Sequence, residues 1–285
     1  MKKNIIDIEK VIEYIELHLD GKLDLEQVSE ASRYSKYHLH RMFADTVGIT
    51  IHDYVQRRQL TEAAKLLVFS DKPIIDVALI CGYESQQAFS TAFKSMYKKP
   101  PAEYREKREF YPLQLRFTLS KKVSEKVFVK DDISLAEHSD IDDWMNLMRL
   151  VIDGYPVMNE ADYLKEIVKC IDERRALVLK DGDIMIGVMA FSYESGSIEF
   201  FGIHPQYRRS SLHKLFLEVL MDNYLSGKEI SMTTFREGDK ADTGYREKLK
   251  QMGFAERELL TEFGYPTQRF VYVPGEKEKS ECLKK

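Results

Sequence analysis

The stretch GYESQQAFSTAFK, residues 82–94, decides the fold of the first third of the chain. Gly82 ends one helical segment, and Ser85 has the short hydroxyl side chain that caps the next one. Behind this cap stand two adjacent glutamines, Gln86 and Gln87. Glutamine is a poor core residue, but its amide both donates and accepts hydrogen bonds. The pattern therefore predicts a helix whose first turn offers hydrogen-bonding groups to a partner outside the chain.

The same pattern occurs a second time, about 50 residues earlier, where SRYS precedes a similar helix. The matched pairs are Ser35 and Ser85, Leu39 and Phe89, Phe43 and Phe93, Tyr54 and Tyr104, and Arg58 and Arg108. A repeated turn followed by a capped amphipathic helix is typical of helix-turn-helix units. Two such units are therefore predicted side by side in the sequence.

The remaining helices of this region follow from apolar periodicity and from capping residues. We expect helices at about 5–19, 24–31, 35–47, 51–68 and 73–82, one that opens at Ser85, and one that opens at Pro101. Asp24 and Gln27 have the spacing of a capping box. Residues 1–110 are thus predicted to form an all-α domain of seven helices.

The outward faces of the two capped helices carry groups that suit DNA. Their apolar residues must pack inward, which leaves polar side chains outside: Lys36, Tyr37, His40 and Arg41 on the first helix, and Gln86, Gln87, Ser90, Thr91 and Lys94 on the second. Arginine pairs with guanine and glutamine with adenine, while lysine and hydroxyl groups bind phosphate. Residues 33–110 hold 13 Lys/Arg against 9 Asp/Glu, although the whole chain has a net charge of −4. A solvated polar face would explain one such helix, but its repetition favours DNA binding.

The chain-wide numbers bound the function classes. A length of 285 residues favours two domains, and no apolar run approaches the ~20 residues of a membrane span. The first 20 residues are charged throughout, so we expect no signal peptide and a cytoplasmic protein. Cys81, Cys170 and Cys282 lie far apart, and neither they nor the seven histidines have metal-ligand spacing. We expect no metal site.

Residues 5–108 resemble the AraC/XylS family of transcription regulators, and among them the MarA/SoxS/Rob branch. The segments YSKYHLHRMF, GYESQQAFSTAFK and KKPPAEYRE carry the resemblance. It implies double-stranded promoter DNA and RNA polymerase as partners. It places base readout on Tyr37, His40, Arg41, Gln86, Gln87 and Thr91, and contacts to the DNA backbone on Ser35, Lys36, Ser85, Ser90 and Lys94. Tyr37, His40 and Thr91 differ from the residues usual in that branch, so the operator sequence stays open.

After residue 110 the chain changes character. Residues 111–131 alternate Leu113, Leu115, Phe117 and Leu119 with other residues, which predicts a strand or hairpin that connects two domains. Residues 132–274 then alternate helical and strand patterns, which indicates an α+β domain. Helices are expected at 140–153, 160–173, 211–226 and 242–252, and strands at 133–136, 176–180, 184–192, 197–203, 229–235 and 267–273. Residues 275–285 read as a charged tail.

The segment GDIMIGVMAFSYESGSIEFFGIHPQYRRSSLHKLFLEVL, residues 182–220, resembles the GNAT acetyltransferase superfamily. The resemblance implies an α+β fold with a central mixed sheet and a loop that holds the pyrophosphate of acetyl-CoA. The candidate anion loop is Arg208, Arg209, Ser210 and Ser211. Ser211 and His213 fill positions where the family has glycine or alanine, and Leu249 stands where it often has the tyrosine that protonates the thiolate.

These departures favour a sensor over an enzyme. We expect a small-molecule effector in the sheet cleft, with Tyr155, Tyr193, Glu199 and Phe201 as candidate contacts. Glu199 is also the candidate general base of the alternative, a bifunctional regulator that still uses acetyl-CoA to acetylate an amine. A third alternative is a structural or dimerisation module without a ligand. No residue is assigned as catalytic, and no cofactor is expected to be required.

Overall fold

The computed structural model describes residues 2–120, 126–151, 159–208, 210–262 and 264–274. The chain forms two compact units, each described here by itself. The N-terminal unit comprises Met1–Ser124, Arg149–Met158 and Pro205–Arg209, and the C-terminal unit comprises the remainder. Among the described residues, no helix is both long and apolar enough to cross a membrane. Tyr155, Arg209, Cys282 and the tail 275–285 lie outside the described residues.

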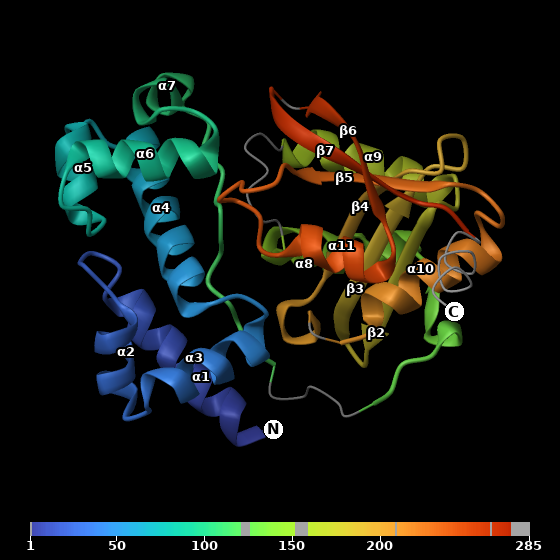
Figure 1. Ribbon diagram of the computed structural model, residues 1–285, viewed down its shortest axis with the longest axis horizontal. Helices are drawn as coiled ribbons and strands as arrows, with labels where there is room; N and C mark the ends of the chain where they lie inside the picture. The colour runs from blue at the N-terminus through green and yellow to red at the C-terminus, as the bar shows by residue number, and fades with distance from the viewer. Residues whose placement is uncertain (1, 121–125, 152–158, 209, 263, 275–285) are drawn as a thin grey trace, which may run out of the picture. The chain divides into compact units, whose positions relative to one another are not determined.

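Helices alone make up the regular structure in the first 110 residues, as predicted (Figure 1). They are α1 Lys2–Leu17, α2 Leu25–Ser32, α3 Lys36–Val47, α4 Ile51–Phe69, α5 Ile74–Ile80, α6 Gln86–Tyr97 and α7 Pro101–Lys107. The seven helices and the two helix-turn-helix units, α2–α3 and α5–α6, are thereby confirmed for the described residues.

Caps fix where the helices begin. The Asp24 carboxylate accepts from the Gln27 N–H and the Gln27 side chain accepts from the Asp24 N–H, which completes the predicted capping box. Ser35 Oγ accepts from the His38 N–H at the start of α3, and Ser85 Oγ accepts from the Ala88 N–H at the start of α6. Each serine satisfies an N–H that the helix itself leaves unpaired. The sequence repeat is therefore also a repeat of capping geometry.

Each helix-turn-helix unit has its own core. In the first, Leu39, Phe43 and Val47 of α3 are fully buried against α1, α2 and the start of α4. The second is built on aromatic rings: Phe93 lies 5.5 Å from Phe89 and 4.4 Å from Tyr97, centroid to centroid. The long helix α4 connects the two and contacts both α3 and the pair α5 and α7.

The prediction of a strand or hairpin at 111–131 is wrong for the residues that the structure describes. Residues 111–120 and 126–129 form no strand, and Lys130–Asp132 is a 3₁₀ turn. The alternating apolar residues are nevertheless buried, as Leu113, Phe117 and Leu119 show. The N–H groups of Leu113, Gln114 and Phe117 donate to side chains of α4 instead of to a neighbouring strand. An extended segment needs partners for its N–H groups, but those partners need not be a sheet.

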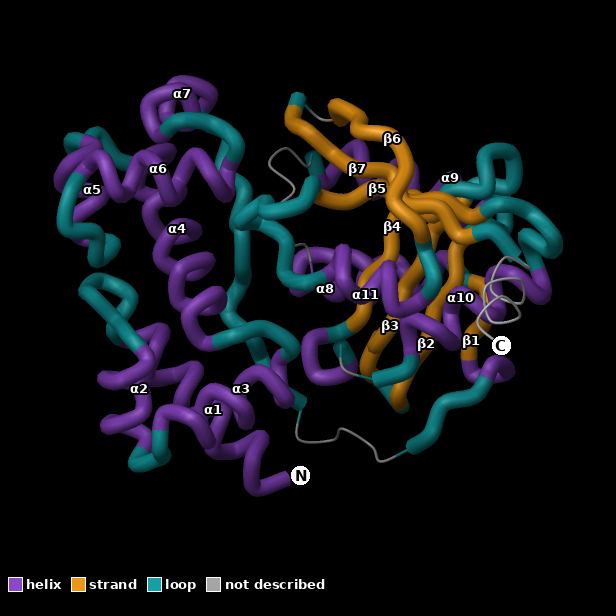
Figure 2. The backbone as a smooth tube through the Cα atoms, viewed as in Figure 1, coloured by secondary structure: helices purple, strands orange, loops and turns teal. Residues whose placement is uncertain are grey.

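The C-terminal unit is α+β, as predicted (Figure 2). Its strands are β1 Ile133–Leu135, β2 Ala176–Asp181, β3 Ile184–Phe191, β4 Ile198–Ile203, β5 Ile230–Phe235, β6 Ala255–Glu262 and β7 Tyr265–Tyr272. Its helices are α8 Ile141–Val151, which belongs to this unit as far as Met148, α9 Glu160–Asp172, α10 Leu212–Asn223 and α11 Tyr245–Met252. One antiparallel sheet has the order β1-β2-β3-β4 and the other the order β5-β7-β6. The expected mixed character rests on one parallel bridge between the sheets, from Ser197 to Ser231.

Strand β6 was not predicted. Its sequence, AERELLTE, is made of good helix formers and has no alternation of apolar and polar residues. It is an edge strand that pairs only with β7, and most of its side chains are exposed. Pairing with β7 therefore overrides the local propensity, which is a tertiary effect.

Candidate nucleic-acid interface

The outer face of α3 carries its predicted base-reading residues in the open. Tyr37 is 77% exposed, and His40 and Arg41 are exposed as well. The guanidinium carbon of Arg41 lies 5.7 Å from the centroid of the Tyr37 ring, one helical turn away. Such a cation–π contact holds the guanidinium against the helix without occupying its N–H donors. Those donors stay available for a base edge or a phosphate.

The outer face of α6 is similar but carries less charge. Gln86 and Gln87 are exposed in the first turn, directly behind the Ser85 cap. One turn later the Thr91 hydroxyl donates to the Gln87 carbonyl at 2.9 Å, which fixes its rotamer and leaves its oxygen free to accept. Lys94 is exposed, whereas Ser90 is half-buried. The two helices therefore present the predicted polar sets, although Ser90 is less accessible than expected.

The predicted backbone-contact residues have local partners. Lys36 Nζ pairs with the Glu26 carboxylate of α2, and this hydrogen bond raises the lysine pKa. Both side chains are more than half exposed, so the pair is weakly held. A phosphate could replace Glu26 at little cost. Ser35 and Ser85 serve first as helix caps, so each hydroxyl oxygen already accepts an N–H of its own helix.

Three of the candidate anion-loop residues are described, and they precede α10. Arg208 and Ser210 are half-buried, and Ser211 is exposed. The Ser210 hydroxyl accepts from the Leu212 N–H at 3.3 Å. His213 is buried, with its ring 5.2 Å from Phe201 and 6.2 Å from Tyr245. Its side chain therefore packs inside the C-terminal unit, at a position where the resembled family has glycine or alanine.

Two of the candidate effector residues that the structure describes, Glu199 and Phe201, lie on opposite faces of β4. A bulge in β4 pairs Phe200 with Ala190 and Ile198 with Phe191, which makes Glu199 the extra residue. Glu199 consequently lies beside α9, whereas the Phe201 ring contacts Phe216 of α10. Plain alternation would have put Glu199 and Phe201 on one face of the strand.

Tyr193 lies just after β3, in the turn that leads to β4. Its hydroxyl donates to the Arg174 carbonyl at 2.9 Å, and its ring contacts Phe191 at 5.1 Å. These contacts tie the β3–β4 turn to the end of α9. They are structural contacts, so the exposed part of the Tyr193 ring is what a ligand could use.

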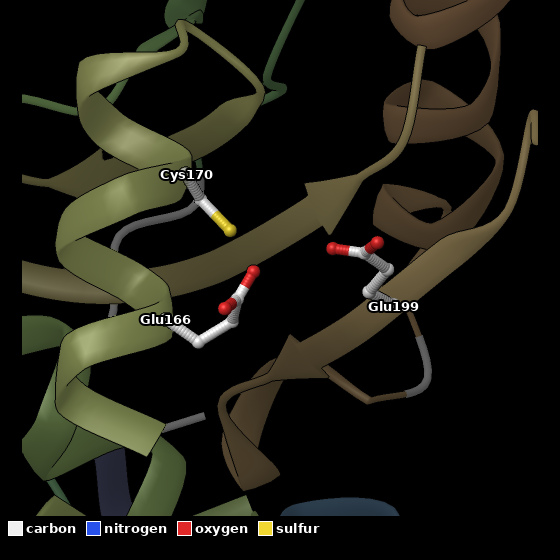
Figure 3. A group of neighbouring side chains, drawn as sticks. All are labelled: Glu166, Cys170 and Glu199. Carbon is white, nitrogen blue, oxygen red and sulfur yellow. The ribbon is translucent and has the colours of Figure 1, made fainter. Parts of the chain in front are cut away.

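Glu199 belongs to an ion-pair cluster that the sequence did not reveal. Arg175, whose side chain is 8% exposed, donates to Glu166 of α9, to Glu173 and to Glu199. The oxygens of Glu166 and Glu199 also lie within 4.8 Å of Cys170 Sγ and of each other, a candidate metal-ligand set (Figure 3). The guanidinium already supplies the cation that these carboxylates need. Burial raises the pKa of the Cys170 thiol to about 12, so it is a protonated thiol and a poor ligand.

The Glu199 carboxylate is already engaged in this cluster. One of its oxygens accepts a hydrogen bond from the Arg175 guanidinium. At the position of the thiolate-protonating tyrosine, Leu249 is fully buried in α11. Tyr245 lies one turn earlier, and its hydroxyl is 3.8 Å from Met232 Sδ.

Comparisons with known proteins agree with the helical pattern. A family model described as a helix-turn-helix domain matches residues 28–107. The multiple antibiotic resistance protein MarA of Escherichia coli is 40% identical over 114 residues, 38% of this chain and 90% of that protein. The HTH-type transcriptional regulator YbfP of Bacillus subtilis is 42% identical over 98 residues, which is 34% of this chain but only 33% of YbfP.

Two solved structures are among the similar ones. The DNA-binding domain of AdpA, solved with a target DNA, is 25% identical and covers 35% of this chain and 89% of its own, with a TM-score of 0.34. A GNAT-family acetyltransferase from Bacillus cereus is 16% identical and covers 50% of this chain and 95% of its own, with a TM-score of 0.40.

Proposed function

Because the chain belongs to the AraC/XylS family of DNA-binding transcription regulators, we propose that it reads a specific operator with α3 and α6 in successive major grooves. The observation that carries this proposal is the repetition. Two serine-capped helices each expose a polar first half, and each packs its apolar face on its own core. The N-terminal end of a recognition helix is the part that reaches base edges.

The connecting helix has a suitable length. With 19 residues at 1.5 Å rise each, α4 is about 28 Å long. Successive major grooves on one face of DNA lie ~34 Å apart. A rigid helix of this length between the two units suits two half-sites separated by one turn of DNA, read by a single chain.

The two recognition helices would read different sequences. Tyr37, His40 and Arg41 on α3 favour a guanine-containing half-site and strong phosphate contact, whereas Gln86 and Gln87 on α6 favour adenine. The operator should therefore be asymmetric. Its guanine-rich half should show the stronger salt dependence, because each displaced counterion steepens the dependence of affinity on salt.

For the C-terminal unit we propose a sensor of a small-molecule effector. Because Glu199 and Phe201 lie on different faces of β4, we place the effector contacts on the face towards α10. Phe201 and Tyr245 are half-buried there, and both rings lie near His213. Aromatic side chains there would suit an apolar or cationic ligand. RNA polymerase is the proposed protein partner at the promoter, from family membership alone.

The bifunctional alternative keeps acetyl-CoA as a substrate. It would need a proton donor near the departing thiolate and a base for the amine. Leu249 and the Arg175-bound Glu199 argue against both, so we favour the sensor. A structural or dimerisation module remains the alternative without a ligand.

The proposed DNA binding is tested by selecting operators from a random duplex library with the full chain. On the selected operator, Gln87→Ala should cost about 1–3 kcal/mol and relax the preference at one base position. Lys36→Ala should weaken all sequences about equally and reduce the salt slope by about 1. Gln251→Ala, at an exposed glutamine of α11, is the matched control and should change neither. Identical profiles for Gln87→Ala and Lys36→Ala would mean that Gln87 contacts phosphate only.

A further inference from the structure

The segment of residues 111–120, here called the strap, follows α7 and runs beside α4 (Figure 2). Its first residue is fastened to the second helix-turn-helix unit. The Tyr111 carbonyl accepts from the Tyr97 hydroxyl at 2.9 Å and from the Tyr104 hydroxyl at 3.3 Å. The Tyr111 N–H donates back to the Tyr104 oxygen at 2.8 Å. One end of the strap therefore belongs to the core of α6 and α7.

The middle of the strap is fastened to α4. The Thr61 hydroxyl oxygen accepts from the N–H of Leu113 at 3.1 Å and of Gln114 at 3.2 Å. Arg58 Nη1 donates to the Gln114 carbonyl at 3.1 Å. Thr61 is buried, so these N–H groups have no access to water as a substitute. Side chains of α4 do here what a neighbouring strand would do in a sheet.

The far end of the strap belongs to the first helix-turn-helix unit. Phe117 stacks on Tyr54 with ring centroids 5.1 Å apart, and its N–H donates to the Tyr54 hydroxyl. Phe117 and Leu119 are buried in the core that α1 and α3 form. Tyr54 and Arg58 both bind the Glu16 carboxylate of α1. The strap thus contacts both helix-turn-helix units and α4, the helix that joins them.

We propose that the strap is a second brace, beside α4, that fixes the relative position of the recognition helices α3 and α6. If α4 were the only connection, the two helix-turn-helix units could rotate about its axis and move relative to each other whenever it bends. A second connection, anchored in both cores and along the helix, removes those motions. Thr61, Tyr104 and Phe117 are then positioning residues for operator recognition. The role of the strap in operator recognition rests on the function proposed above. The bracing of the two helix-turn-helix units by the strap does not depend on that function.

The relative position of α3 and α6 can be measured without DNA. Spin labels are attached at Asp45→Cys on α3 and Ala88→Cys on α6, both exposed sites, and the distribution of distances between them is recorded. The full chain is labelled with Cys282 replaced by serine, since Cys81 and Cys170 are buried. The distance distribution should be narrow in this parent and about twofold broader with Thr61→Val or Phe117→Ala. Tyr104→Phe, a smaller change, serves if those variants do not fold.

Val77→Ala is the matched control, because it lowers stability from a buried site of α5 without removing a strap hydrogen bond. Its distribution should stay as narrow as that of the parent. If Thr61→Val and Tyr104→Phe also stay narrow, the brace is refuted. The same result follows if Val77→Ala broadens the distribution as much as they do.

The DNA arm compares selected operators whose half-sites are moved apart or together by one base pair. The parent should discriminate against both, and the strap variants should lose most of that discrimination while the control keeps it. A merely structural role would lower affinity equally at every spacing. If the parent binds no operator but the distances behave as expected, the proposed function fails and the brace stands.

Discussion

Arg58→Met should strongly destabilise the N-terminal unit, because it strands a buried carboxylate. Arg58 Nε and Nη2 donate to the two oxygens of Glu16 at 2.8 and 2.7 Å, and Nη2 also reaches Glu62 at 3.0 Å. The Arg58 side chain is 8% exposed and that of Glu16 12%. Methionine fills much the same volume but removes the hydrogen-bonded counterion of Glu16, which keeps the Tyr54 hydroxyl and the charge of Arg116.

The magnitude follows from this burial. Removing one partner of a buried, hydrogen-bonded ion pair costs about 3–5 kcal/mol, since the remaining charge has lost both its water and its counterion. The Gln114 carbonyl also loses its Arg58 donor. With a slope near 2 kcal/mol per molar urea, the unfolding midpoint should fall by about 1.5–2.5 M. The double variant Glu16→Gln, Arg58→Met should recover most of this loss, because no unpaired charge remains.

The chain offers an internal control for the assay. Its one tryptophan, Trp144, is fully buried in α8 of the C-terminal unit. Urea unfolding followed by tryptophan fluorescence therefore reports that unit, while circular dichroism at 222 nm also reports the helices of the N-terminal unit. Arg58→Met should shift the dichroism transition alone. A loss below about 1 kcal/mol, or no recovery in the double variant, would refute the argument from a stranded charge.

Four further predictions concern separate features. Arg33→Gly should stabilise the N-terminal unit by about 0.5–1 kcal/mol in urea unfolding, because Arg33 has a φ of 58° and glycine adopts that region freely; no gain would mean that the side chain offsets the strain. Burial alone would raise the pKa of Glu16, but the Arg58 hydrogen bonds and charge lower it below the ordinary value of 4.5. The stabilisation by Glu16 is therefore complete above pH 4.5 and is lost as the pH falls through the folded-state pKa. Glu16→Gln should make the stability less dependent on pH in this acid range. Cys81 and Cys170, whose thiol pKa burial raises to about 12, should resist iodoacetamide at pH 8 until the protein is unfolded, and rapid native labelling would contradict their burial. Acetyl-CoA with a panel of amines should release thiol only at the spontaneous rate, and faster turnover would favour the bifunctional alternative.

The sequence by itself determined the helical N-terminal domain. Local signals were sufficient there: Ser35 and Ser85 cap helices through their own backbone neighbours, and Phe43 and Phe93 lie on apolar stripes with helical periodicity. Such interactions span a few residues, so they can be read along the chain. Which polar side chains lie outside on α3 and α6 followed from the same periodicity, and the roles assigned to them stay predictions.

Tertiary structure alone decided the features whose partners are distant in sequence. The strap takes its hydrogen bonds from Thr61, more than fifty residues away, so its alternating burial looked like a strand. Strand β6 forms against its own helix propensity because β7 supplies its hydrogen bonds. The bulge at Glu199 sends this side chain to Arg175 and away from Phe201. Alternation along a strand tells which residues share a face only while the register is regular, and register is set by the neighbouring strand.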